Sequence, residues 1–162
     1  MCAAKGFDGS RIVVVSGGSN LGSFTDSRIV LESVEIYSIK NDFWSKAPSL
    51  NEKRWYHSTC SLGYQTYVLC GTNGEHRIRS IERLDLHSMT AWDKLEFPDH
   101  SAISVRMNAV AVAVGENEIC LLGGMNGAYC SDGYIINVKE MHVSPLEQRY
   151  FISGDCQMMS SL

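Results

Sequence analysis

The segment 57–61 gathers the residue types most able to do chemistry in this chain. His57 is followed by Ser58, Cys60 and Ser61, which are types that serve as bases and nucleophiles in enzymes. On a β-strand, however, adjacent side chains point to opposite faces. No Gly-x-Ser-x-Gly turn follows to supply an oxyanion site. We therefore predict no catalytic residue here, and a structural role for His57 at the start of a strand.

A metal site is the second kind of chemistry to consider, because the chain has five histidines and six cysteines. The close spacings typical of zinc sites, such as C-x-x-C and H-E-x-x-H, do not occur. Residues 1–6 contain no apolar signal region, which favours a reducing, cytoplasmic location with free thiols. We accordingly expect neither a metal nor a cofactor.

Charge and hydropathy argue against two further classes of function. The net charge of −4 is the wrong sign for binding a phosphate backbone, so no nucleic-acid partner is expected. No apolar stretch approaches the ~20 residues that a membrane helix needs, so no membrane partner is expected either. With 44% hydrophobic and 20% charged residues in 162, the chain has the composition of one globular domain.

An internal repeat defines the elements that must position these side chains. Residues 54–86 and 106–138 align without a gap at an offset of 52, which places Arg54 on Arg106 and Gly71 on Gly123. The same alignment places Cys60, Cys70 and Cys120 on Val112, Leu122 and Val68. These cysteines are thus predicted to be small buried hydrophobes.

A looser first copy precedes the other two. It carries Gly17–Gly18, then Val34-Glu35 and Trp44. Counted against Gly71–Thr72, this copy has about seven extra residues between its glycine pair and Val34. An insertion at a fixed place in a repeat is typical of a loop on one face, often the binding face.

Each copy is predicted to contain four antiparallel strands and no helix of useful length. Short apolar runs bounded by turn residues indicate strands. The valine-rich run 107–114 is predicted to be an inner strand that is covered on both faces, as 58–62 is in the second copy. The other predicted strands are 12–15, 66–70 and 119–122, then 34–39, 81–86 and 134–138, then short strands that begin at Trp44 and Trp92.

These residues resemble the kelch repeats. That family combines a basic residue and often His before the inner strand, an apolar run into Gly-Gly, a Val-Glu-x-Tyr element, then Trp and Pro-x-Leu. The chain shows the pattern over roughly residues 12–138. The matching residues are Val13 to Gly18, Val34-Glu35-x-Tyr37, Trp44, Pro48-Ser49-Leu50, Arg54-Trp55-Tyr56-His57, Gly71, Ile81-Glu82 and Trp92.

The resemblance implies an all-β fold of kelch-type β-propeller blades, each a four-stranded antiparallel sheet. We expect about three blades, after an N-terminal lead of residues 1–11 and before a tail of residues 154–162. The expected blades are 12–50, 51–98 and 99–146. Segment 149–153 is expected to complete the first blade, because residues 1–11 leave no room for an inner strand. Propellers typically have four to eight blades. This leaves a partial propeller, an assembly of two or more chains, and an open stack of three sheets as alternatives.

The predicted functional surface is the face where the connections after each second strand meet those that enter each inner strand. Arginine and tyrosine are enriched at binding hot spots. The residues expected to be exposed there and to contact a partner are Arg54, Tyr56, Glu75, Arg77, Arg79, Asn126 and Tyr129. The residues assigned to the structural repeat are Gly17, Gly18, Gly71, Gly123, Gly124, Tyr37, Trp44 and Trp92. Four charged residues recur with the repeat and are also predicted to be structural: Glu35, Glu82, Arg54 and Arg106.

These expectations lead to a non-catalytic protein-interaction module, or scaffold. By resemblance, the partner belongs to a cytoskeletal context, such as actin, or to a ubiquitin-ligase context. Self-association is a further expectation. The alternative is a fragment of a kelch-type propeller enzyme of the copper oxidase or sugar isomerase class. A copper oxidase would need Tyr, His and Cys to converge at the axis, and the repeat does not show this.

Overall fold

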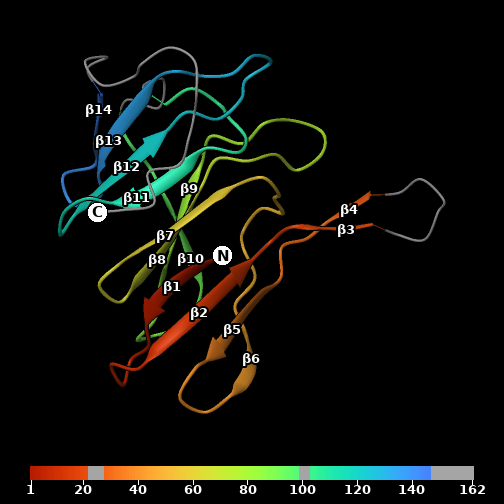
Figure 1. Cartoon of the computed structure of the whole chain (residues 1–162), viewed down its shortest axis with the longest axis vertical. Coiled ribbons are helices and arrows are strands. Elements are labelled where there is room, and N and C mark those ends of the chain that lie inside the picture. The colour runs from red at the N-terminus through yellow and green to blue at the C-terminus, as the bar shows by residue number, and fades with distance from the viewer. Residues whose placement is uncertain (22–27, 99–102, 147–162) are drawn as a thin grey trace.

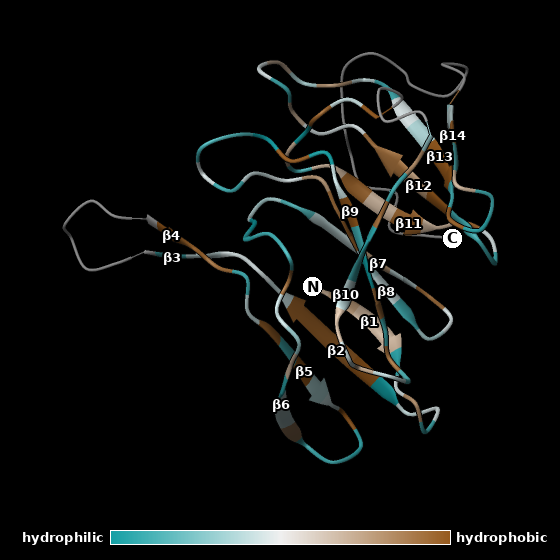
Figure 2. Ribbon diagram, turned by 180° about the vertical axis from the view of Figure 1, so that it is seen from behind, coloured by the Kyte–Doolittle hydropathy of each residue, from teal (hydrophilic) through white to brown (hydrophobic). Residues whose placement is uncertain are grey.

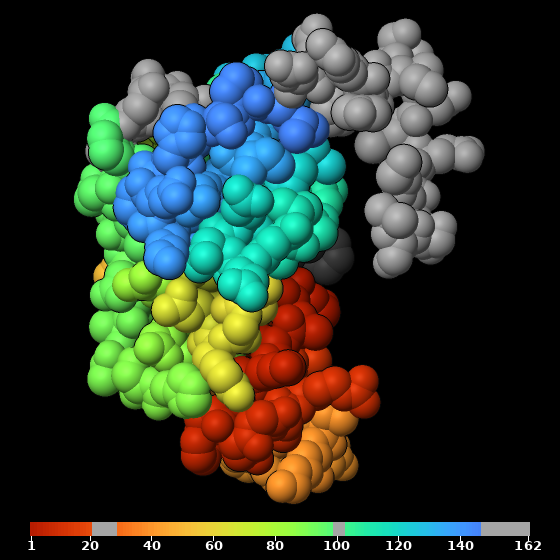
Figure 3. Space-filling model, turned by 90° about the vertical axis from the view of Figure 1, so that its left-hand side faces the viewer, coloured from red at the N-terminus to blue at the C-terminus, as the bar shows by residue number. Residues whose placement is uncertain are grey.

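The described residues fold into three four-stranded antiparallel sheets, or blades, that are stacked along the long axis of the molecule (Figures 1 and 3). This computed structural model describes residues 1–21, 28–98 and 103–146. All the regular elements in these ranges are strands, which confirms the all-β prediction. None of the described residues forms a helix long and apolar enough to cross a membrane.

Each blade is a meander in which successive long strands pair with each other. Blade 1 has the order β1-β2-β5-β6, with bounds Cys2–Lys5, Arg11–Ser16, Val34–Ser38 and Phe43–Ala47. Blade 2 contains β7 to β10, with bounds Ser58–Leu62, Gln65–Leu69, Ile81–Asp85 and Trp92–Leu95. Blade 3 contains β11 to β14, with bounds Val110–Ala113, Glu118–Leu122, Gly133–Asn137 and His142–Pro145.

The insertion in the first copy forms a separate hairpin. Strands β3 (Ser19–Leu21) and β4 (Arg28–Val30) pair with each other and project away from the sheets (Figure 1). The hairpin lies on the same side as the β8–β9 and β12–β13 connections. This position agrees with the prediction of an extra loop on one face.

Two apolar layers hold the blades together, because the side chains of a strand alternate between its two faces. In β8, Val68 faces the layer between blades 1 and 2, while Tyr67 and Leu69 belong to the layer between blades 2 and 3. Blade 2 is therefore covered on both faces. In Figure 2 the strongly hydrophobic strands are β2 of blade 1 and β11 and β12 of blade 3, the blades on either side.

The prediction that residues 1–11 have no strand of their own is wrong. Strand β1 pairs with β2 along its whole length, from Cys2 with Val14 to Lys5 with Arg11. Blade 1 thus contains its own inner strand, and the place expected for residues 149–153 is filled. Residues 149–153 themselves lie outside the described part of the chain.

The gapless offset of 52 also misplaces the glycine pair. Gly17, Cys70 and Gly123 are spaced by 53 residues, and all three adopt a positive φ, at 56°, 60° and 59°. Gly18, Gly71 and Gly124 follow them, also with positive φ. Cys70 of blade 2 therefore corresponds to Gly17 of blade 1 and Gly123 of blade 3, and not to Leu122 as the offset of 52 had implied. For the same reason Cys120 matches Tyr67 and not Val68.

The third inner strand is shorter and more exposed than predicted. It begins at Val110, not at Met107. Ala111 packs against the apolar layer between blades 2 and 3, whereas Val110, Val112 and Val114 are exposed. The prediction of a strand covered on both faces is wrong for β11, because no described residue covers its outer face.

Candidate interaction face

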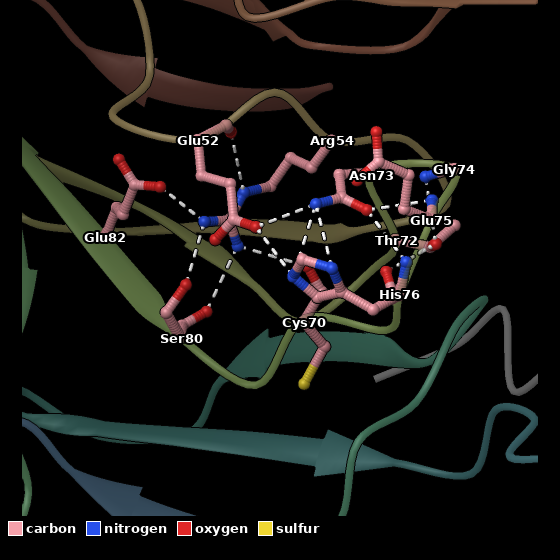
Figure 4. A network of polar contacts seen from close by, with 10 residues as sticks. All are labelled: Glu52, Arg54, Cys70, Thr72, Asn73, Gly74, Glu75, His76, Ser80 and Glu82. Atoms are coloured by element: carbon pink, nitrogen blue, oxygen red, sulfur yellow. Dashed lines mark hydrogen bonds and ion pairs between the residues drawn. The ribbon is translucent and has the colours of Figure 1, made fainter.

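A buried arginine lies beneath the loop face of blade 2. Arg54 is fully buried, so the prediction that it is exposed to a partner is wrong. Its guanidinium donates hydrogen bonds to the Cys70 and Ser80 carbonyl oxygens, both at 3.1 Å, and forms an ion pair with Glu82 (Figure 4). Arg54 thereby joins the entrance of β7 to the exit of β8 and the start of β9.

Glu82 extends this network to the connection between blades 1 and 2. Its second carboxylate oxygen accepts hydrogen bonds from the Asn51 backbone N–H at 2.7 Å and from the Asn51 side-chain amide at 2.9 Å. The same amide donates to the Trp92 carbonyl oxygen. A buried ion pair whose remaining lone pairs are satisfied in this way is a structural device. The structural role predicted for Glu82 is consistent with these contacts.

Blade 3 repeats the device with one change of partner. Arg106, also fully buried, donates to the Gly123 carbonyl oxygen at 2.7 Å and pairs with Asp132 at 2.9 Å. Tyr134 occupies the place of Glu82, where its ring lies 4.8 Å from the Arg106 guanidinium. Burial opposes ionisation of Asp132, but hydrogen bonds from Arg106 and Tyr134 outweigh it and lower the pKa of the carboxyl.

The loop 72–79 between β8 and β9 is shaped by its own side chains. The Asn73 amide oxygen accepts hydrogen bonds from the Glu75 and His76 N–H groups at 3.0 and 2.9 Å, and its amide nitrogen donates to Glu52 (Figure 4). The Thr72 hydroxyl donates to the His76 carbonyl oxygen. Such local hydrogen bonds fix a turn. The loop is therefore ordered and mostly hydrophilic (Figure 2).

Tyr56 lies next to this loop in a conformation that is unusual for a bulky residue. Its φ is 53°, in the left-handed region that side chains other than Gly, Asn and Asp rarely adopt. The exposed ring stacks on Trp55, with the ring centroids 4.0 Å apart. At the same place in blade 3, Asn108 has a φ of 54°. The strain is thus specific to the tyrosine.

A short ladder brings two of the predicted residues together. Trp55 pairs with Thr72, and Thr72 pairs with Arg77, so Arg77 and the Trp55–Tyr56 pair flank one backbone segment. In blade 3 the same ladder runs from Met107 through Met125 to Tyr129. Exposed Tyr129 therefore takes the place of exposed Arg77.

The other three predicted residues are exposed but do not join this ladder. Glu75 lies at the tip of the 72–79 loop, and Asn126 lies in the equivalent loop of blade 3. Arg79 lines a shallow pocket with Lys94 and Glu96, beside the outer strand of blade 2. The sequence pattern missed Trp55 and Asn73. The signal for Asn73 was the Asn-Gly dipeptide, which is typical of a turn.

The repeat residues fall into two groups. Trp92 is buried, and its indole N–H donates to the Pro48 carbonyl oxygen of blade 1 at 2.8 Å. Tyr37 and Trp44 form a ring pair with centroids 5.1 Å apart, but Trp44 remains exposed. Trp92 therefore joins blade 2 to blade 1, whereas Trp44 remains on the surface of blade 1.

The segment 57–61 is committed to packing and to hydrogen bonds within the fold. The Ser58 hydroxyl donates to the Ala109 carbonyl oxygen at 2.5 Å, and Ser61 bonds Cys2 and Thr66. Burial raises the pKa of the Cys60 thiol to about 12, so it is protonated at neutral pH and is a poor nucleophile.

His57 is held at the junction of blades 1 and 2. Its Nε2 lies 3.0 Å from the Ser16 hydroxyl, while its buried Nδ1 has no described hydrogen-bond partner. Burial, together with the charge of Arg54, lowers the pKa of the imidazole to about 4. A neutral, enclosed imidazole fits the structural role predicted for His57.

The other chemistry-bearing residues do not assemble into a ligand set. Within the ranges that the structure describes, no three His, Cys, Asp or Glu side chains gather as a metal site would require. Cys2, Cys60, Cys70, Cys120 and Cys130 are free cysteines.

Comparisons with known proteins point to one family. The chain is 34% identical over 76 residues to Kelch-like protein 24 of Homo sapiens, a match that covers 47% of the chain. It is 30% identical over 112 residues to Kelch-like protein 35 of Mus musculus, which covers 69% of the chain. These matches span only 11% and 17% of the two relatives. No family model matches the chain.

The structure and the comparisons agree on the repeat unit. Each blade has four antiparallel strands, and a buried arginine precedes the inner strand of blades 2 and 3. A positive-φ pair ends the second strand of every blade. With the similarity to two Kelch-like proteins, these features show blades of the kelch-repeat type in a partial β-propeller.

Proposed function

We propose that the chain is a non-catalytic protein-interaction module that binds its partner through the loop face. The observation that carries this proposal is the exposed, strained Tyr56. A bulky residue in the left-handed region costs about 1–3 kcal/mol, and Asn108 occupies the same place without that cost. An exposed ring kept at such a cost supports a role in recognition.

The neighbouring residues add the chemistry of a hot spot. Arg77 lies one ladder position from Thr72, and Tyr129 repeats its place in blade 3. Tyrosine and arginine are enriched among residues that dominate binding energy. The loop beneath Arg77 is already fixed by Asn73 and Thr72, so less conformational entropy is lost on binding.

The partner class follows from the kelch resemblance. We propose a protein of the cytoskeleton or of a ubiquitin-ligase assembly, met in the cytoplasm. A reducing compartment suits buried thiols such as Cys60 and Cys70, whose pKa values burial raises to about 12 and about 11. Arg77 would favour an acidic group on the partner, and Tyr56 a flat apolar one.

The test is capture of partners from a cell lysate by the immobilised chain, with quantification of each captured protein. We expect Tyr56→Asn and Arg77→Ala each to lower capture of specific partners by about tenfold or more, the effect of a hot spot. Tyr56→Asn should leave the fold intact, because asparagine tolerates this backbone conformation.

A matched control is available at the opposite end of the same blade. Tyr64 is an exposed aromatic residue on the β7–β8 turn, where its ring lies 4.3 Å from that of His87. Tyr64→Ala should capture the same proteins as the wild type. If both loop-face variants capture every protein as well as the wild type does, this face is not the binding surface.

A further inference from the structure

An asparagine recurs at one place in the loop region of every blade. Asn20, Asn73 and Asn126 are spaced by 53 residues, the same spacing as the positive-φ residues that end the second strands. Glycine follows Asn73 and Asn126, whereas leucine follows Asn20 within β3. The loop face therefore contains two Asn-Gly pairs at equivalent positions.

An Asn-Gly pair can rearrange without an enzyme, which is one reason why asparagine is a thermolabile residue. The backbone nitrogen of the glycine attacks the side-chain carbonyl carbon of the asparagine. Glycine permits this approach, because it has no side chain and its backbone is conformationally free. The reaction needs an asparagine side chain that can leave its hydrogen bonds and a glycine N–H that is not engaged elsewhere.

The fold withholds both requirements from the pair in blade 2. Asn73 is only 8% exposed. Its amide oxygen accepts hydrogen bonds from two backbone N–H groups at 3.0 and 2.9 Å, and its amide nitrogen donates to a Glu52 carboxylate oxygen at 3.2 Å (Figure 4). The Gly74 N–H, which would be the nucleophile, donates to the Thr72 hydroxyl at 3.2 Å. To react, the pair would have to give up these bonds.

The pair in blade 3 has no such restraints. Met125 pairs with Tyr129, so residues 126–128 form a short turn that is exposed throughout. Among the described residues, neither the Asn126 side chain nor the Gly127 N–H has a hydrogen-bond partner. A Cβ added to Gly127 would meet no atom outside the neighbouring residues within 4 Å. The space around the reacting atoms is therefore open.

We propose that Asn126 is a site of spontaneous deamidation and that the hydrogen bonds of the 72–79 loop protect Asn73 from the same reaction. A bond forms between the Gly127 nitrogen and the Asn126 Cγ, the Cγ–Nδ2 bond breaks, and the Gly127 proton leaves with the amide as ammonia. Water then opens the cyclic imide. Opening at Cγ gives aspartate, and opening at the backbone carbonyl carbon gives isoaspartate. One water is consumed, one ammonia is released, and nothing is oxidised or reduced.

Either product places a carboxylate on the loop face of blade 3. The new charge lies in the same turn as the highly exposed Tyr129, and isoaspartate also lengthens the backbone of this turn by one atom. A chain that has aged in this way would present a different surface to a partner. That consequence rests on the proposed function, whereas the reaction itself does not.

The experiment is incubation of the full chain at neutral pH and physiological temperature, followed by peptide mapping with mass spectrometry over a time series. Fragmentation locates each converted asparagine, and chromatography separates aspartate from isoaspartate peptides. In the folded chain, Asn126 should convert about tenfold or more faster than Asn73. Tenfold corresponds to about 1.4 kcal/mol, which is about the net contribution of one hydrogen bond, and several restrain Asn73 and Gly74. A parallel sample unfolded in guanidinium chloride should lose the difference, because both pairs then lie in flexible chain.

Thr72→Val is the matched variant, because it removes the hydroxyl that engages the Gly74 N–H and keeps the size of the side chain. It should raise the rate at Asn73 and leave the rate at Asn126 unchanged, with circular dichroism to check that it is folded. If it does not fold, the comparison of folded and unfolded wild type decides alone. Asn126→Gln should abolish the fast conversion, since glutamine would have to form a larger ring.

Four results would overturn the proposal. They are an Asn126 that stays intact, equal rates at the two asparagines in the folded chain, a difference that persists after unfolding, and an unchanged rate at Asn73 in folded Thr72→Val.

Discussion

Replacing Arg54 with methionine should lower the free energy of unfolding, because it leaves the buried carboxylate of Glu82 without its partner. Arg54 and Glu82 are 0% and 1% exposed, so water cannot take over from the guanidinium. The Cys70 and Ser80 carbonyl oxygens also lose their donor. Breaking a buried pair in this way costs about 3–5 kcal/mol, a large part of the stability of a small domain.

Arg106→Met is the matched comparison, because the two arginines are equally buried but their partners are not. The side chain of Asp132 is 44% exposed and can be hydrated once Arg106 is gone. The expected cost is about 1–3 kcal/mol, that of buried groups left without hydrogen bonds. The variant Arg54→Met with Glu82→Gln removes the buried charge and should recover about 1–3 kcal/mol relative to Arg54→Met alone.

The measurement is urea unfolding followed by tryptophan fluorescence, with free energies compared at equal slopes. Two results would refute the reasoning. The first is an equal cost for Arg54→Met and Arg106→Met. The second is a double variant no more stable than Arg54→Met, which would mean that the lost packing of Arg54, and not the stranded charge of Glu82, sets the cost.

Two further predictions concern the junction of blades 1 and 2. The pKa of His57 is about 4 in the fold, against 6.5 in the unfolded chain. Below pH 6.5 the unfolded chain therefore binds a proton that the fold does not, so the free energy of unfolding is highest above pH 6.5 and decreases as the pH falls toward 4. Wild-type stability should therefore drop by about 2 kcal/mol more than that of His57→Gln between about pH 7.5 and pH 5 in urea unfolding, and parallel pH profiles would contradict this. Gly71 has a φ of 95°, and an added Cβ would lie 2.7 Å from the Trp55 carbonyl oxygen. Gly71→Ala should thus cost more than about 2 kcal/mol, against about 1 kcal/mol for Gly63→Ala, which has positive φ but open space, and equal melting temperatures for the two variants would show that the contact is relaxed cheaply.

The blade architecture could be predicted from the sequence because most of its pairing is local. Consecutive apolar runs separated by turn residues pair as hairpins, and the repeated order of glycine, tryptophan and proline fixed the unit. The short strand β1 was not predicted, because the sequence of Cys2–Lys5 carries only a weak strand signal. Its position is set by pairing with β2, which is tertiary information.

The register error has a specific cause. The β7–β8 turn has two residues, Gly63 and Tyr64, between the paired Leu62 and Gln65. The β11–β12 turn has three, residues 115–117, because the Val114 N–H bonds the Glu118 carbonyl oxygen. The β12–β13 connection of blade 3 is one residue shorter than the β8–β9 connection of blade 2. The extra residue in the β11–β12 turn is thereby offset, and the third strands again align at an offset of 52. A gapless alignment cannot reveal compensating changes of this kind.

The burial of Arg54 shows where expectations based on residue type fail. Charged residues are rarely buried unless they are paired, so Arg54 was expected on the surface. Its recurrence as Arg106, with acidic residues downstream in both copies, was the signal of a structural pair. Tyr56, Arg77 and Tyr129 are exposed, as is expected of loop connections, which run over the surface of a fold.

The buried arginine also explains how a face made of loops can be rigid. The Arg54 side chain bonds within blade 2, while its carbonyl oxygen accepts a hydrogen bond from the Gly18 N–H of blade 1 at 2.8 Å. The Arg106 carbonyl oxygen accepts from Gly71 in the same way at 2.9 Å. One residue therefore fixes both the loop of its own blade and the junction with the blade before it. Because these bonds use backbone atoms and buried side chains, exposed positions such as Arg77 and Tyr129 can differ between blades without altering the stack. The repeat thus leaves the loop face free to change while the spacing between its loops stays constant.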